Sequence, residues 1–224
     1  MAYATVEELR GQIGKSSADS DPILQSLLNA ASDAIDKFCN RPLGFLADTT
    51  ASARYYCGSG GTVQWIDECV SITTVSVKDA ATDDTYTDWS ATDWIACAGA
   101  PSNPDFDPIS KGFPYTFIIV SAVGDYDHFT SGQFTTRRGF KPDLLTRRGV
   151  PTVKVTAKWG FATSVPATVE QACLIQAARW FKRAEASWSD TTGAPDLGRL
   201  MYTKSLDPDV EMLLVKTGLR RKVL

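Results

Sequence analysis

The chain has one histidine, His128, and only five cysteines among its 224 residues. The number of cysteines is odd, they lie far apart, and none forms a Cys-x-x-Cys pair. Structural zinc sites need closely spaced Cys and His ligands, so this composition argues against zinc. Widely spaced thiols are instead typical of buried, free cysteines in a reducing compartment. The five are Cys39, Cys57, Cys69, Cys97 and Cys173.

Motifs for nucleotide binding and for nucleophilic catalysis are also missing. The chain contains no G-x-x-x-x-G-K-[ST], no G-x-G-x-x-G after a strand and no G-x-S-x-G. Its aspartates do not form a calcium loop. One acid–base or metal cluster is conceivable, at Asp125, Asp127 and His128, but such residues in a loop are more often surface residues. We therefore expect no enzymatic activity, no metal and no cofactor, and a hydrolase site near His128 is the weaker alternative.

Long hydrophobic runs and a strong net charge are absent as well. No apolar stretch reaches membrane-spanning length, and the first residues do not have the pattern of a signal peptide. The formal net charge is -3, which argues against a basic, DNA-wrapping protein. Hydrophobic residues make up 43% of the chain, enough to fill the core of one domain, or of one domain with a large insertion.

Helical patterns occur near both ends of the chain. Thr5 and Glu8 have the spacing of a capping box, which predicts a short first helix. Residues 21–40 carry a clear apolar stripe, with Asp21 expected as the cap and Pro22 at the first position. Residues 166–187 form a second long helical pattern. We expect these two long helices to pack through their stripes, with Leu27 and Trp180 in the core.

The middle of the chain has the period of β-strands. Strands are predicted at residues 54–57, 62–66, 71–78, 84–89, 115–121 and 152–159, and the glycine-rich residues 58–61 are predicted to be a hairpin turn. Residues 93–114 are rich in Pro, Gly, Ser and Asp, and because so long a loop is uncommon in a compact domain, they are either a functional loop or contain an element that the pattern does not reveal. The predicted class is α+β. Residues 1–50 and 163–224 would form a helical bundle, and residues 51–162 an inserted antiparallel β domain, as a small sandwich or barrel.

A dense basic cluster lies at the end of the predicted β domain. It is either a solvated loop or a contact for a phosphate backbone or an acidic partner. Its members are Arg137, Arg138, Lys141, Arg147 and Arg148.

The C-terminal region is the second candidate contact. Residues 207–218 predict a capped amphipathic helix with Val210, Leu213 and Leu214 on its apolar face. Isolated helices below about 12–15 residues are marginal in water, so this face needs a partner, which need not be its own domain. A basic tail with an apolar tip follows, formed by Arg220, Arg221, Lys222, Val223 and Leu224.

Three parts of the chain together resemble the head-to-tail connector, or adaptor, proteins of long-tailed bacteriophages and phage-like particles. They are the opening helices with the stretch 27–43, the β segment from Arg54-Tyr55-Tyr56 through residues 70–75, and residues 153–161 followed by Val165-Pro166 and a helix. The resemblance implies a structural protein of the virion neck, assembled in the host cytoplasm and not in a membrane. It would form a homo-oligomeric ring, usually of twelve copies, between the portal and the stopper or tail, with an axial channel for genomic DNA.

The same resemblance implies that the C-terminal segment reaches into the portal. The portal-binding residues would then be Val210, Leu213, Leu214, Arg220, Arg221, Lys222, Val223 and Leu224. The basic cluster would contact DNA or an acidic partner. The alternative is a nucleic-acid or regulatory binding module that uses the basic cluster at Arg137–Arg148.

Overall fold

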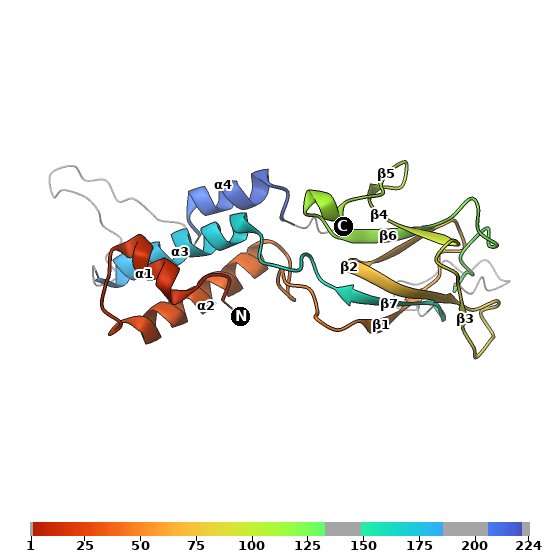
Figure 1. Ribbon diagram of the computed structural model, residues 1–224, viewed down its shortest axis with the longest axis horizontal. Helices are drawn as coiled ribbons and strands as arrows, with labels where there is room; N and C mark the ends of the chain where they lie inside the picture. The colour runs from red at the N-terminus through yellow and green to blue at the C-terminus, as the bar shows by residue number, and fades with distance from the viewer. Residues whose placement is uncertain (1, 133–148, 186–205, 221–224) are drawn as a thin grey trace, which may run out of the picture. The chain divides into compact units, whose positions relative to one another are not determined.

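A computed structural model describes residues 2–132, 149–185 and 206–220. In these ranges the chain forms α-helices and an antiparallel sheet, which is an α+β fold (Figure 1). The chain divides into two compact units. The helical unit consists of Met1–Phe45 and Val165–Leu224, and the β unit consists of Leu46–Ser164.

The helical unit begins with α1 (Val6–Ile13) and α2 (Asp21–Phe38). The predicted capping box of α1 is confirmed, because the Thr5 hydroxyl accepts from Glu8 N at 3.3 Å and the Glu8 carboxylate accepts from Thr5 N at 2.7 Å. The cap of α2 is Ser20 rather than Asp21, a shift of one residue that is common at helix ends. The unit continues with α3 (Ala167–Glu185) and α4 (Pro208–Lys216).

The core of the helical unit lies between α2 and α3, which pack on each other as predicted. Its α2 side consists of Leu24, Leu28, Ala31 and Ile35, all fully buried. Leu27 and Trp180, which the sequence placed in the core, are only half-buried. The reason for Leu27 is geometric, since the buried positions of α2 recur every three or four residues and Leu27 lies beside that stripe. The α3 side consists of Val169, Ala172, Cys173 and Ala177.

Tyr3, which precedes α1, contacts both α2 and Phe45, which follows α2. Its hydroxyl donates to Asp36 and accepts from Phe45 N at 3.1 Å, and its backbone N donates to Ser32 Oγ at 3.0 Å. Its ring meets that of Phe45 edge-on. Burial raises the pKa of the Asp36 carboxyl above its ordinary value, although the Tyr3 hydrogen bond acts in the opposite direction.

The β unit is one antiparallel sheet with the strand order β1-β7-β2-β6-β4-β5, and β3 pairs with β2. A short 3-10 helix, Ile109–Lys111, precedes β6. The strands are β1 (Ser52–Cys57), β2 (Val63–Val77), β3 (Thr87–Asp88), β4 (Trp94–Ala100), β5 (Asn103–Asp105), β6 (Tyr115–Val120) and β7 (Pro151–Trp159).

The sheet differs from the predicted one in three ways. First, β2 is a single strand of 15 residues where the sequence predicted two. Its first part pairs with β6 and its second part with β7, with bulges near Cys69 where the partner changes. Second, β1 pairs with β7 rather than with β2, so residues 58–61 are not a hairpin turn between paired strands. Third, residues 93–114, where no strand was predicted, contain β4 and β5.

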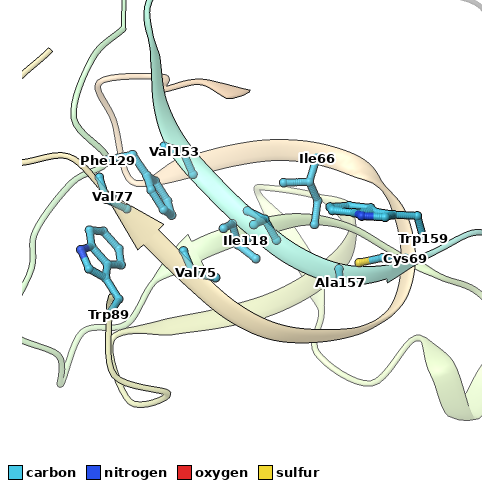
Figure 2. Close-up of a cluster of buried hydrophobic side chains, with 11 residues drawn as sticks. Ile66, Cys69, Val75, Val77, Trp89, Ile118, Phe129, Val153, Ala157 and Trp159 are labelled. Carbon is cyan, nitrogen blue, oxygen red and sulfur yellow. The ribbon is translucent and has the colours of Figure 1, made fainter. Parts of the chain in front are cut away.

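The core of the β unit lies on one face of this sheet (Figure 2). On β7 the buried residues alternate with Lys154, Thr156 and Lys158, as the sequence predicted. The Trp89 ring stacks with the rings of Tyr126 and Phe129, at centroid distances of 4.4 Å and 5.0 Å. The core residues are Ile66, Cys69, Val75, Val77, Trp89, Ile118, Phe129, Val153, Val155, Ala157 and Trp159.

Candidate interaction surfaces

The predicted C-terminal helix exists as α4, and its apolar face is covered within the helical unit. Val210 and Leu214 are fully buried, Leu213 is half-buried, and α4 packs on α3. This corrects the expectation that Val210 and Leu214 are available to the portal. The physical reason is that a helix this short needs an apolar surface, and α3 offers one in the same chain.

Polar contacts hold both ends of α4. At its start, the Asp207 carboxylate caps Asp209 N at 2.9 Å and accepts from Arg179 Nη1 at 2.8 Å. Asp207 N also donates to Gln176 Oε1 at 2.9 Å. After the end of the helix, the buried Arg41 donates through Nε to the Leu219 carbonyl at 3.0 Å. Helix α4 is therefore anchored at both ends as well as along its apolar face.

The outward side of α4 is the part that a partner can reach. Met212 is 49% exposed and Val215 is 52% exposed. Arg220 is exposed too, with its guanidinium 4.8 Å from the Phe38 ring centroid. Sequence reasoning missed Met212 and Val215, although their spacing of three residues places them together on a helix surface. The rest of the predicted tail, Arg221, Lys222, Val223 and Leu224, lies outside the described residues.

The basic cluster cannot be placed in the same way, because Arg137, Arg138, Lys141, Arg147 and Arg148 all lie outside the described residues. The described residues on either side of that segment meet near the end of β1. Gly132 N donates to Gly58 O at 3.1 Å, and Val150 N donates to Gly132 O at 2.9 Å. A Cβ atom at Gly58 would lie 2.0 Å from Thr130 O, so glycine is required for this close approach.

His128 and Asp127 form a surface pair. His128 Nδ1 contacts the Asp127 carboxylate, and both side chains are exposed. The hydrogen bond from His128 holds the pKa of Asp127 below its ordinary value. Asp125 is also exposed, and its backbone N donates to Asp93 Oδ1 at 3.1 Å. In the described part of the chain, no group of three or more His, Cys, Asp or Glu residues is arranged to hold a metal ion.

The five cysteines are free thiols. Cys57, at the end of β1, is exposed, and the other four are buried. Burial raises the pKa of Cys39 to about 11, of Cys69 to about 12 and of Cys97 to about 11. Burial therefore disfavours the reactive thiolate form at these three positions.

An apolar patch lies on the face of the β unit opposite its core. Trp65 on β2 is 54% exposed and contacts Phe117 on β6 at 5.1 Å between ring centroids. Ile119 lies two residues after Phe117 on β6, so the two side chains point to the same face. Ile95 on β4 pairs with Ile119 and therefore lies on the same face as Trp65. Exposed tryptophans surrounded by apolar residues are typical of protein interfaces. The sequence pattern did not identify this patch, because pairing with β6 is what brings its residues together.

Among the helices of the described ranges, none has the length and apolar character needed to cross a membrane.

The chain resembles known proteins in structure rather than in sequence. No protein-family model matches the chain, and no curated protein matches it. Among solved structures, the chain is similar to one described as the neck of a native GTA particle computed with C12 symmetry. The two are 17% identical, and the match covers 98% of this chain and 90% of the other, with a TM-score of 0.45.

Proposed function

We propose that this protein is a structural component of a virion neck, a head-to-tail adaptor. It forms a homo-oligomeric ring between the portal and the stopper or tail, and the ring leaves an axial channel through which genomic DNA passes. In this role the protein has no cofactor and catalyses no reaction.

The observation that carries this proposal is the order of the three resembling parts along the chain, together with the elements they form. The stretch 27–43 includes most of α2, Arg54–Tyr56 lies on β1, and residues 153–161 lead from β7 toward α3. The helical unit is assembled from the two ends of the chain, and the β unit is inserted between them. The connector resemblance rests on the same order of opening helices, β segment and closing strand with a helix.

The portal contact that we propose is narrower than the sequence suggested. Val210 and Leu214 stabilise the helical unit from within, so they act on portal binding only by holding α4 in place. The contact itself would be made by the outward residues Met212 and Val215, by Arg220, and by the tail that follows it. A basic, partly apolar tail fits an acidic groove with an apolar floor.

Two measurements test the adaptor role. The first is the assembly state of the purified protein, by sedimentation velocity and electron microscopy, where rings are expected. The second applies if the neighbouring genes encode a portal and a major capsid protein. In that case this protein is expected to co-purify with that portal. A chain that stays monomeric at high concentration and does not bind portal would contradict the proposal.

The nucleic-acid or regulatory binding module is the alternative outcome. It would be favoured if the isolated monomer bound DNA with a steep dependence on salt, and if that binding was lost on charge reversal at Arg137, Arg138, Arg147 and Arg148. For the adaptor, the same charge reversal should instead impair assembly or DNA retention while the fold survives.

A further inference from the structure

The cations of the β unit are distributed unevenly. Within its described residues the only Lys and Arg side chains are Arg54, Lys78, Lys111, Lys154 and Lys158, fewer than half as many as the Asp and Glu side chains. Arg54 pairs with Asp67 at 2.8 Å, and Lys111 pairs with Asp105 at 2.7 Å. The other three lysines make no ion pair with any residue of the described ranges. Within the described residues they are therefore the Lys and Arg side chains of this unit that no carboxylate pairs.

These three lysines lie on one face of the sheet, opposite its core. The register aligns Tyr55 of β1, Lys154 of β7, Ser76 of β2 and Asp88 of β3 in one row, and paired residues of antiparallel strands point to the same side. Lys158 lies on the same side of β7, because side chains along a strand alternate. Lys78 Nζ lies 5.1 Å from the centre of the Tyr86 ring.

Tyr55 and Tyr86 lie at one end of this face and contact each other. The Tyr86 ring lies 5.9 Å from the Tyr55 ring, and the Tyr86 hydroxyl donates to Pro151 O at 2.7 Å. Tyr55 is itself 57% exposed. We call the surface formed by Tyr55, Lys78, Tyr86, Lys154 and Lys158 the lysine face. It combines aromatic rings with ammonium groups that no carboxylate of the described residues pairs, which suits an acidic partner.

The acidic residues at its border favour a protein over a nucleic acid. Asp88 lies in the same row as Lys154, and Asp79 follows Lys78 in the chain. A nucleic acid carries phosphates at regular, close intervals, so some of them would face these carboxylates. An acidic protein loop has only a few carboxylates, which can meet the lysines and avoid the aspartates.

The chain carries such a loop itself, in the turn between β2 and β3. Residues 79–84 of this turn include Asp79, Asp83 and Asp84 and no basic residue, and Lys78 of the lysine face directly precedes them. Asp79 and Asp84 are exposed, whereas the Asp83 carboxylate holds the turn by accepting from Ala80 N at 2.7 Å. We propose that the lysine face of one copy binds the β2–β3 turn of a neighbouring copy. The two surfaces adjoin at Lys78 and Asp79 but carry opposite charge, and a head-to-tail contact between them generates a closed ring where the rotation permits. This inference rests on the proposed ring.

Charge reversal on each side of the contact, followed by reversal on both sides, tests the inference. One variant carries Lys154→Glu with Lys158→Glu, and the second carries Asp79→Lys with Asp84→Lys. Each should weaken self-association about tenfold or more in sedimentation velocity at moderate salt, since attraction becomes repulsion at two positions. The variant with all four changes should recover most of the wild-type association. Asp125→Lys with Asp127→Lys makes the same charge change as the second variant, away from the turn, and should leave association unchanged.

The possible results separate this inference from the proposed function. One result is that wild type forms rings while the variant with all four changes associates no better than the two-residue variant that associates less. That result refutes the contact between the lysine face and the turn but not the proposed ring. The same conclusion follows if neither two-residue variant alters association. If Lys154→Glu with Lys158→Glu weakens binding of double-stranded DNA and leaves association unchanged, the lysine face binds nucleic acid instead. If wild type never self-associates, both the ring and this contact are wrong. Circular dichroism of each variant checks that the fold is retained.

Discussion

Two truncations of the C-terminus should behave very differently. Deleting residues 221–224 removes only residues beyond Arg220. Deleting residues 219–224 also removes Leu219 and Arg220, which contact the helical unit. The Leu219 side chain is only 5% exposed, its carbonyl accepts from Arg41, and Arg220 lies over Phe38. A tail without contacts in its own chain would leave folding intact when it is deleted, whereas these contacts predict that the longer deletion destabilises the helical unit.

The expected loss can be worked out from these contacts. Burying a leucine side chain stabilises a protein by about 1.5–3 kcal/mol. The hydrogen bond from the Arg41 guanidinium to the Leu219 carbonyl contributes about 1 kcal/mol. This is less than is usual for a charged donor, because Arg41 keeps other partners when this bond is lost. The contact of Arg220 with Phe38 is exposed and adds about 0.5–1 kcal/mol. The sum is about 3–5 kcal/mol, a large share of the roughly 5–15 kcal/mol by which a typical protein is stable.

The assay is thermal unfolding followed by far-UV circular dichroism. Each kcal/mol corresponds to roughly 2–4 °C for a protein of this size, so the longer deletion should lower Tm by about 6–20 °C. Deleting residues 221–224 should leave Tm nearly unchanged, while portal binding is expected to be lost. Met212→Ala with Val215→Ala is the matched control, because both side chains are about half exposed and each change should stay within about 0.5 kcal/mol. Equal Tm values for the two truncations would refute the anchoring of α4 through Leu219.

Three further predictions concern the core, pH and the thiols. Leu28→Ala should cost about 2–5 kcal/mol, since Leu28 is fully buried, whereas Leu27→Ala should cost clearly less; equal losses in urea unfolding would contradict the packing of α2. The folded-state pKa of Asp36 lies above its unfolded value, so this group's contribution to stability is lost as pH rises through the folded pKa. Asp36→Asn should therefore gain stability relative to wild type at pH 7 but not at acid pH, and an equal difference at both would argue against a raised pKa of the Asp36 carboxyl. Among the cysteines only Cys57 should react rapidly with a thiol reagent in the native protein, and rapid labelling of a second thiol, identified by mass spectrometry, would show that the helical or β core opens.

Local patterns were enough to predict several elements of this protein. The capping box at Thr5, the apolar stripe of α2 and the alternation of β7 each depend on residues within one element. A helix or a strand of this kind is specified by which side chains share a face, and that information is present in a short stretch of sequence. The same holds for α4, whose cap at Asp207 and apolar positions are local features.

The partners of these elements were decided only by the tertiary structure. Strand β1 pairs with β7, about a hundred residues further along the chain, although β2 follows it directly. Strand β4 is an apolar run without alternation, and it is recognisable as a strand only because β6 pairs with it. Backbone hydrogen bonding has no side-chain code, so the order of strands depends on which faces can be buried together.

The apolar face of α4 and the lysine face also differ in how much of each the sequence alone predicts. The apolar face of α4 was visible in the sequence, but whether α3 or another protein covers it depends on where the chain returns after residue 205. Lys78, Lys154 and Lys158 are unremarkable in sequence, and only the register of β1, β7, β2 and β3 gathers them beside Tyr55. By itself, the sequence determined which elements form and which of their faces are apolar. The tertiary structure decided which faces are covered and which charges stay unpaired, because burial and ion pairing depend on neighbours distant in the chain.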